Sequence, residues 1–121
     1  MKRPLIWLGT THDVVRGFSD TVRRDVGYAL YVAQLGGADP SAKPLRGFGG
    51  RGVLEVVADD TSGTYRAVYT VKFEEAVYVL HAFQKKSTKG IATSKADIEM
   101  IKRRLKIAED EHRSAMKPQG K

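Results

Sequence analysis

The chain has 121 residues and a mass of 13.4 kDa, a length that predicts one domain and excludes a multidomain enzyme. It contains no cysteine, which excludes a disulfide framework, a thiolate nucleophile and a cysteine zinc site, and favours a reducing, cytosolic setting. Lysine and arginine number 21 against 14 acidic residues, and the resulting net charge of +7 favours a polyanionic partner.

The N-terminal third predicts a strand followed by two helices. The apolar run LIWL at residues 5–8 predicts a short strand and is too short for the apolar region of an export signal. Residues 10–18 predict a short helix, and Ser19 is a suitable N-cap for a longer helix that ends at Gly36-Gly37. The longer helix has an apolar face that we expect to pack on a sheet, formed by Val22, Val26, Ala29, Leu30 and Ala33.

A long loop over residues 39–52 follows the second helix. It is rich in proline and glycine, and long loops in compact domains are often functional. The letters of residues 47–52 match the dinucleotide-binding fingerprint, but that motif must follow a strand and open a helix, whereas here a strand follows. We therefore interpret the glycines as conformational freedom in a basic loop, whose cationic residues are Lys43, Arg46 and Arg51.

Three β-rich runs after the loop predict an antiparallel meander; they cover residues 53–58, 65–73 and 76–83. If Glu74-Glu75 form a two-residue turn, Arg66 lies opposite Phe83 on the neighbouring strand. Arg66, His81 and Phe83 then share one face of the sheet. This assignment depends on the loop length, because a change of one residue moves the side chains of one strand to the other face.

Ser94 is predicted to open the last helix, with Asp97 three residues later in an arrangement like a capping box. The buried stripe of this helix is Ile98, Ile101, Leu105 and Ala108, and its other face is basic. The residues after Arg113 have no periodicity, so we expect a single domain over 1–113 and a disordered tail over 114–121. No segment approaches the roughly 18 apolar residues that span a bilayer, so no membrane partner is expected.

The basic charge is concentrated in residues 84–106, where eight basic and two acidic residues account for +6 of the +7 net charge. Lys85 and Lys86 directly follow the last predicted strand. We therefore expect two ammonium groups to join the guanidinium of Arg66 and the imidazole of His81 at one end of the sheet. Such a set of cations fits a phosphate-rich ligand.

These candidate residues also have purely structural interpretations, which the sequence leaves open. Arg66 could pair with Glu55 as an ordinary surface ion pair, and His81 could be a histidine of the core. The run from Lys85 to Lys89 could be a solvated loop. The three histidines are far apart in the sequence and lack metal-ligand spacing, so neither a metal nor a cofactor is expected.

Four motifs, taken together in their order and spacing, carry a family resemblance: GYAL at 27–30, KPL at 43–45, GTYRAVY at 63–69 and YVLHAFQKKS at 78–87. They resemble the phage-derived, HigB-like branch of the RelE/ParE toxin superfamily. The resemblance implies an α+β fold, with N-terminal helices packed on a small antiparallel sheet and a C-terminal helix. It also implies the toxin of a type II toxin-antitoxin system in the cytoplasm, silenced by a cognate antitoxin that is often a helix-turn-helix protein.

RelE-type members of this superfamily cut messenger RNA on the ribosome without a metal, by attack of the 2′-hydroxyl on the adjacent phosphorus. By this resemblance, Arg66 would bind the scissile phosphate, with His81 as the acid or base and Lys85 and Lys86 as electrostatic partners. The expected RNA-binding residues are Lys43, Arg46, Arg51, Lys89, Lys102, Arg103 and Arg104. No tyrosine follows Tyr78, so the C-terminal tyrosine of several RelE-like enzymes has no counterpart.

Two other functions are compatible with the same resemblance and the same basic surface. ParE-like proteins of the superfamily inhibit DNA gyrase without cutting RNA, so the chain could be a non-enzymatic toxin of that kind. It could also be a plain RNA-binding module, whose affinity would depend strongly on salt and which would show no cleavage.

Overall fold

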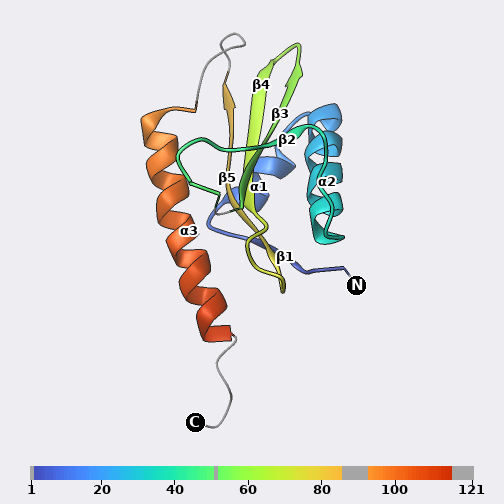
Figure 1. The fold of residues 1–121 in the computed structure, drawn as a ribbon. Coiled ribbons are helices and arrows are strands. Elements are labelled where there is room, and N and C mark those ends of the chain that lie inside the picture. Colours follow the sequence, from blue (N-terminus) through green and yellow to red (C-terminus); the bar gives the residue numbers. More distant parts are fainter. Residues whose placement is uncertain (1, 51, 86–92, 116–121) are drawn as a thin grey trace.

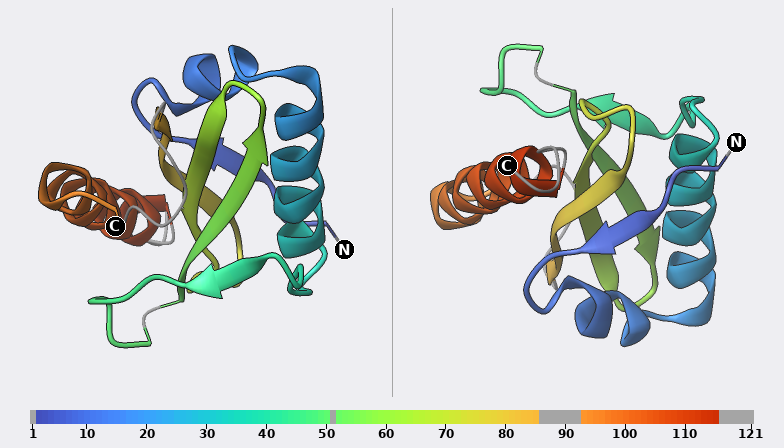
Figure 2. Two further views of the ribbon diagram at one scale, coloured as in Figure 1. Left: turned by 90° about the horizontal axis from the view of Figure 1, so that it is seen from above. Right: turned by 90° about the horizontal axis from the view of Figure 1, so that it is seen from below.

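The computed structural model describes residues 2–50, 52–85 and 93–115, and shows one sheet between two helical layers (Figure 1). Helices α1 and α2 cover one face of the sheet, and α3 crosses the other face (Figures 1 and 2). In chain order the elements are β1 (Leu5–Trp7), α1 (Thr11–Arg16), α2 (Asp20–Gln34), β2 (Ala42–Pro44), β3 (Val53–Asp60), β4 (Gly63–Thr70), β5 (Val77–Lys85) and α3 (Lys95–Ala115). The expected α+β class is confirmed.

The sheet has the strand order β1-β5-β4-β3-β2, and its two edge strands differ from the sequence-based expectation. Strand β1 pairs in parallel with β5, so the sheet is mixed rather than purely antiparallel. Strand β2 lies inside the segment expected to be a loop and pairs antiparallel with β3. Its three residues end in a proline, which an edge strand tolerates but which gives no strand pattern to recognise.

Helix α2 packs against the sheet with the face that its sequence predicts. The backbone N–H of Val22 donates to the Ser19 side chain, which confirms Ser19 as the N-cap. All five predicted apolar residues of this face are buried. They form one core with α1 and with the side chains of β3, β4 and β5 that point the same way. Within the part of the chain that the structure describes, no helix is long and apolar enough to cross a membrane.

A second core lies between the sheet and α3. Ile101, Leu105 and Ala108 are buried there, and Ile98 is partly buried, as the predicted stripe requires. Phe48, from the segment between β2 and β3, is buried in the same core and draws that segment toward the α3 side of the sheet. Helix α3 ends at Ala115 and therefore includes residues 114 and 115, which the sequence assigned to the tail; residues 116–121 lie outside the described residues.

The β4–β5 ladder combines a correctly predicted register with an unpredicted bulge. Arg66 lies opposite Phe83, as expected, but the strands end at Thr70 and begin again at Val77, so Glu74-Glu75 are not a two-residue turn. The register shifts by one residue beside Leu80, which is the extra residue of β5. A bulge of this kind depends on pairing across the ladder, which the alternation within one strand does not reveal.

Candidate functional site

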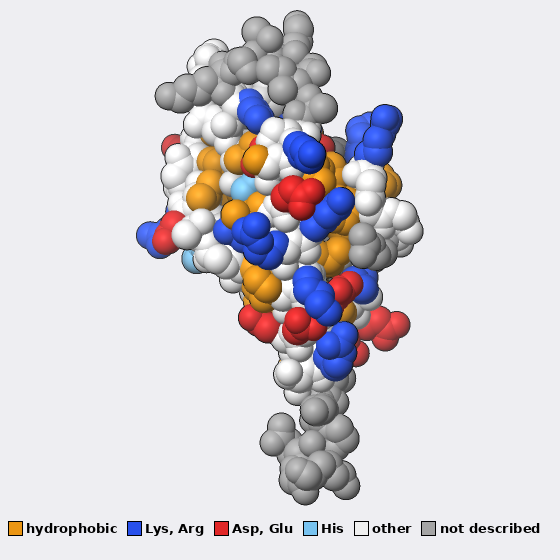
Figure 3. All heavy atoms as spheres, turned by 90° about the vertical axis from the view of Figure 1, so that its left-hand side faces the viewer, with side chains coloured by type: hydrophobic (Ala, Val, Ile, Leu, Met, Phe, Trp, Pro, Cys, Tyr) orange, Lys and Arg blue, Asp and Glu red, His pale blue; other side chains and the backbone are white. Residues whose placement is uncertain are grey.

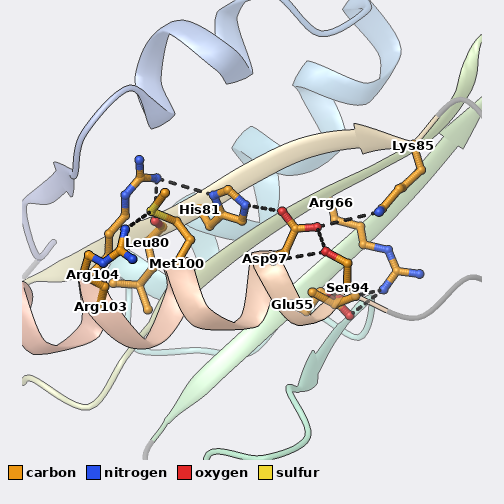
Figure 4. A network of polar contacts seen from close by, with 11 residues as sticks. Glu55, Arg66, Leu80, His81, Lys85, Ser94, Asp97, Met100, Arg103 and Arg104 are labelled. Atoms are coloured by element: carbon orange, nitrogen blue, oxygen red, sulfur yellow. Dashed lines mark hydrogen bonds and ion pairs between the residues drawn. The ribbon is translucent and has the colours of Figure 1, made fainter.

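Polar side chains from β3, β4, β5 and α3 meet on the face of the sheet that α3 crosses (Figure 4). Because His81 and Phe83 stack with ring centroids 5.1 Å apart and Phe83 lies opposite Arg66, the predicted sharing of one face is confirmed. The sequence-based prediction did not include the carboxylates that pair with these basic side chains. The site is divided into two ion-pair clusters, one around the carboxylate of Glu55 and one around that of Asp97.

The Glu55 cluster joins β3, β4 and Thr93, which lies two residues before α3. Arg66 Nη1 lies 3.1 Å from Glu55 Oε1 and donates to Thr93 Oγ1 at 3.3 Å, while the Thr93 hydroxyl donates to Glu55 Oε2 at 2.7 Å. The side chains of Arg66 and Glu55 are only 12% and 13% exposed. The pair is therefore largely buried, unlike an ordinary surface ion pair, and removing either partner leaves a charge without its closest counter-ion.

A cleft of about 530 Å³ opens over this pair. It is lined by Pro44, Leu45, Arg46, Glu55, Arg66, Thr93 and Ile98. Arg46 reaches the cleft because the segment after β2 passes toward α3. The cleft therefore holds a guanidinium that can bind a phosphate beside a carboxylate that can accept a proton.

The Asp97 cluster joins β5 to the first turn of α3. Asp97 Oδ1 lies 2.8 Å from His81 Nε2, and Asp97 Oδ2 lies 3.7 Å from Lys85 Nζ. The Ser94 hydroxyl donates to Asp97 Oδ2 at 2.7 Å and accepts the Asp97 backbone N–H at 3.1 Å, so the predicted capping pair is present. Burial by itself would raise the pKa of Asp97, but the hydrogen bonds from His81 and Ser94 and the charge of Lys85 outweigh it and lower that pKa.

Arg104 differs from its neighbours on α3, because it turns inward. Its Nη1 donates to the carbonyl oxygen of Leu80 at 3.0 Å and lies 3.4 Å from His81 Nδ1. Burial, followed by the charge of Arg103, lowers the pKa of Arg104. Gly9 accommodates the guanidinium, since a Cβ at that position would lie 2.7 Å from Arg104 Nη2. The sequence-based prediction that Arg104 belongs to an exposed basic face is therefore wrong, because its guanidinium lies against β5.

The other described RNA-binding candidates are exposed, and Lys43 lies directly opposite Glu55 in the β2–β3 register. Lys102 and Arg103 are exposed on α3, and Lys43 is exposed on β2. On this side of the molecule basic side chains are scattered and acidic side chains lie between them (Figure 3). Three further candidates, Arg51, Lys86 and Lys89, lie outside the described residues.

Sequence reasoning missed the site roles of Glu55, Thr93 and Asp97. Glu55 was weighed only as an ordinary partner of Arg66, and Asp97 only as a capping residue. The Glu55 position follows from the β3–β4 register, because Arg66 pairs with Val57 and Glu55 lies two residues away on the same face. Across the described ranges, no three histidine, aspartate or glutamate side chains gather as a metal site requires.

Comparison with known proteins places this architecture in context. Residues 13–106 match the family model described as phage-derived protein, Gp49-like. No curated protein matches the chain. Among solved structures, a mutant of the E. coli toxin RelE in the free state is similar, with a TM-score of 0.55 and 20% sequence identity over 88% of this chain and 98% of that one. At this identity, the likeness establishes a RelE-like fold.

Proposed function

The chain belongs to the phage-derived Gp49-like family, a toxin family of RelE and HigB type, and from this membership we propose that it is a ribosome-dependent mRNA endoribonuclease. The family implies an antitoxin partner. The observation that carries the proposal is the Glu55–Arg66 pair on the wall of the cleft. A buried guanidinium beside a carboxylate supplies two of the groups that RNA cleavage without a metal requires.

The reaction needs no protein nucleophile. The 2′-oxygen of the substrate forms a bond to the adjacent phosphorus, and the bond from phosphorus to the 5′-oxygen of the next nucleotide breaks. This leaves a 2′,3′-cyclic phosphate and a free 5′-hydroxyl. The protein must accept the proton of the 2′-hydroxyl, stabilise negative charge on the phosphoryl oxygens and supply a proton to the leaving oxygen.

Each of these tasks has a candidate residue. Arg66 binds the phosphoryl oxygens after exchanging Glu55 for the phosphate, and Glu55 is then a carboxylate within the same cleft that can take the proton of the 2′-hydroxyl. His81 is the candidate acid or base of the site. Lys85 adds positive charge beside it, and the same role for Lys86 remains a prediction from the sequence.

The RNA backbone and the ribosome would be held by basic residues around the cleft. Arg46 lines the cleft itself, and Lys43, Lys102 and Arg103 are exposed nearby in the fold on β2 and α3. Arg51 and Lys89, which lie outside the described residues, remain predictions from the sequence. We further propose that the antitoxin is a helix-turn-helix protein that covers the basic surface with an acidic segment, and that the pair acts in the cytoplasm.

The decisive experiment maps the 5′ ends of a labelled message after translation in a reconstituted system. The arms are the wild type with and without ribosomes, Arg66→Ala, and Arg16→Ala, which removes an exposed arginine of α1 on the other face of the sheet. We expect new ends only with ribosomes, absent from Arg66→Ala and unchanged in Arg16→Ala, with circular dichroism confirming that both variants fold. A message left intact by folded wild-type protein that still arrests growth would instead indicate a bound target such as gyrase.

A further inference from the structure

Asp97 is the carboxylate through which α3 contacts two candidate residues of β5, His81 and Lys85. Its Oδ1 faces His81 Nε2, and its Oδ2 faces Lys85 Nζ and the Ser94 hydroxyl. A capping residue alone would need only the contacts to Ser94. The additional contacts point away from the helix and toward β5 (Figure 4).

The surroundings of His81 select one tautomer of its neutral ring. Arg104 Nη1 lies 3.4 Å from His81 Nδ1, and a guanidinium donates hydrogen bonds but cannot accept them. Nδ1 is therefore the nitrogen with the lone pair, and the proton is on Nε2, from which it is donated to Asp97 at 2.8 Å. A carboxylate behind a histidine holds both the plane and the tautomer of the ring in this way.

Among the described residues, the charged groups around His81 come from three elements. Helix α3 contributes Asp97 and Arg104, β5 contributes Lys85, and on β4 the charged residue nearest in the register is Arg66, opposite Phe83. Asp97 is the one anion in this group.

We propose that Asp97 is a positioning residue of the ribonuclease site, which fixes the ring orientation and tautomer of His81 and holds the ammonium of Lys85 beside it. The inference rests on the proposed function, because the role of His81 in proton transfer is part of that proposal. The lowered pKa of Asp97 is consistent with these contacts, since the hydrogen bonds from His81 and Ser94 stabilise its carboxylate.

The test compares Asp97→Asn with Asp20→Asn. Asp97→Asn keeps the size of the side chain and removes its charge. Asp20 is likewise an acidic residue in the first turn of a helix, α2, but it pairs with Arg23 on the opposite side of the sheet. The control variant therefore reproduces the loss of a first-turn carboxylate without touching His81.

Two measurements are made on each variant. The first records the ring ¹⁵N shifts of His81 across pH, assigned by their disappearance in His81→Gln. The second records single-turnover cleavage on programmed ribosomes across pH. We expect Asp97→Asn to shift the ring ¹⁵N resonances of His81, to slow cleavage about 10- to 100-fold, and to change the pH profile of the rate. Asp20→Asn should match the wild type in all three.

The outcomes separate the two proposals. If the wild type cuts and Asp97→Asn keeps both the wild-type ring shifts and the wild-type pH profile, Asp97 has only a structural role and the inference is overturned while the proposed function stands. A slower rate with an unchanged profile overturns it too, since lower stability alone would produce that result. If the wild type leaves the message intact on ribosomes, the proposed function fails, and with it any catalytic meaning of the Asp97 contact.

Discussion

Leu80 and His81 are consecutive residues of β5, yet both face α3. In a regular strand, neighbouring side chains point to opposite faces, but the bulge at Leu80 interrupts that alternation. Leu80 is fully buried in the core beneath α3, while His81 contacts Asp97 on the same helix. The packing of the hydrophobic core and the position of the candidate catalytic histidine are therefore set by one local irregularity.

Leu80→Ala should lower the free energy of unfolding by about 2–5 kcal/mol, because it leaves a cavity between β5 and α3. Ile107→Ala removes a comparable side chain from α3 that is 41% exposed, and should change stability by about 0.5 kcal/mol or less. Urea titration of both variants gives the comparison. Equal transition midpoints for the two would contradict the burial of Leu80.

Two glycine-to-alanine substitutions should have opposite effects. Gly9 has a φ of +57° and lies against the guanidinium of Arg104, so Gly9→Ala should destabilise the fold and displace Arg104 from Leu80. Gly27 lies inside α2 with open space where a Cβ would project, and Gly27→Ala should stabilise the protein by about 0.4–1 kcal/mol. Thermal melting of both variants tests the pair, and a stabilising Gly9→Ala would show that the Arg104 contact is not as described.

The protein should lose stability in strong alkali through Tyr69. Burial, with a smaller contribution from the charge of Asp39, raises the pKa of the Tyr69 hydroxyl to about 12. In the unfolded chain the same group ionises near pH 10, so the stability from its burial is present below pH 10 and is lost as the pH rises toward 12. Unfolding by urea between pH 9 and 12 should show this decline in the wild type.

The Tyr69 effect has a direct control. Tyr69→Phe should flatten the decline, because no group then ionises at that site. Tyr28→Phe changes a tyrosine that is 61% exposed and should leave the decline as it is in the wild type. A decline that is equally steep in both variants would assign the alkaline loss of stability to other residues.

Lys102 and Arg103 should contribute to RNA binding through charge alone. Both are exposed on α3, so Lys102→Ala and Arg103→Ala should each reduce the slope of log K against log salt by about 1 for a short unstructured RNA. Arg16→Ala, on the α1 side of the sheet, should leave the slope unchanged. Fluorescence anisotropy at several salt concentrations measures this, and equal slopes in all variants would remove α3 from the RNA-binding surface.

Local patterns in the sequence were sufficient to predict the helices and the central strands. The apolar stripe of α2 and the opposition of Arg66 and Phe83 depend on the spacing of residues near one another along the chain. The parallel pairing of β1 with β5 joins segments far apart in the sequence, and β2 is a three-residue edge strand that contains a proline. Neither leaves a periodic signal that sequence reasoning could use.

Several residues of the candidate site could be predicted from the sequence, but most of the ion pairs and hydrogen bonds between them could not. The sequence identifies Arg66, His81 and Lys85 as candidate residues on neighbouring strands. It does not reveal that the carboxylates of Glu55 and Asp97 pair with them. Asp97 reaches His81 only because α3 crosses the sheet at one particular angle and depth. Those quantities are set by the packing of the whole core beneath the helix, so no local motif contains them.

The pairing of Arg66 with Glu55 means that the charge of this guanidinium is balanced before any ligand enters the cleft. A phosphate that binds Arg66 replaces the carboxylate of Glu55. Its binding free energy is therefore the difference between the phosphate pairing and the carboxylate pairing. Inorganic phosphate brings no other contacts and gains little from that exchange. A long polyanion also gains binding free energy from contacts to other basic residues along its length. We therefore expect Arg66 to favour a long polyanion over a small anion.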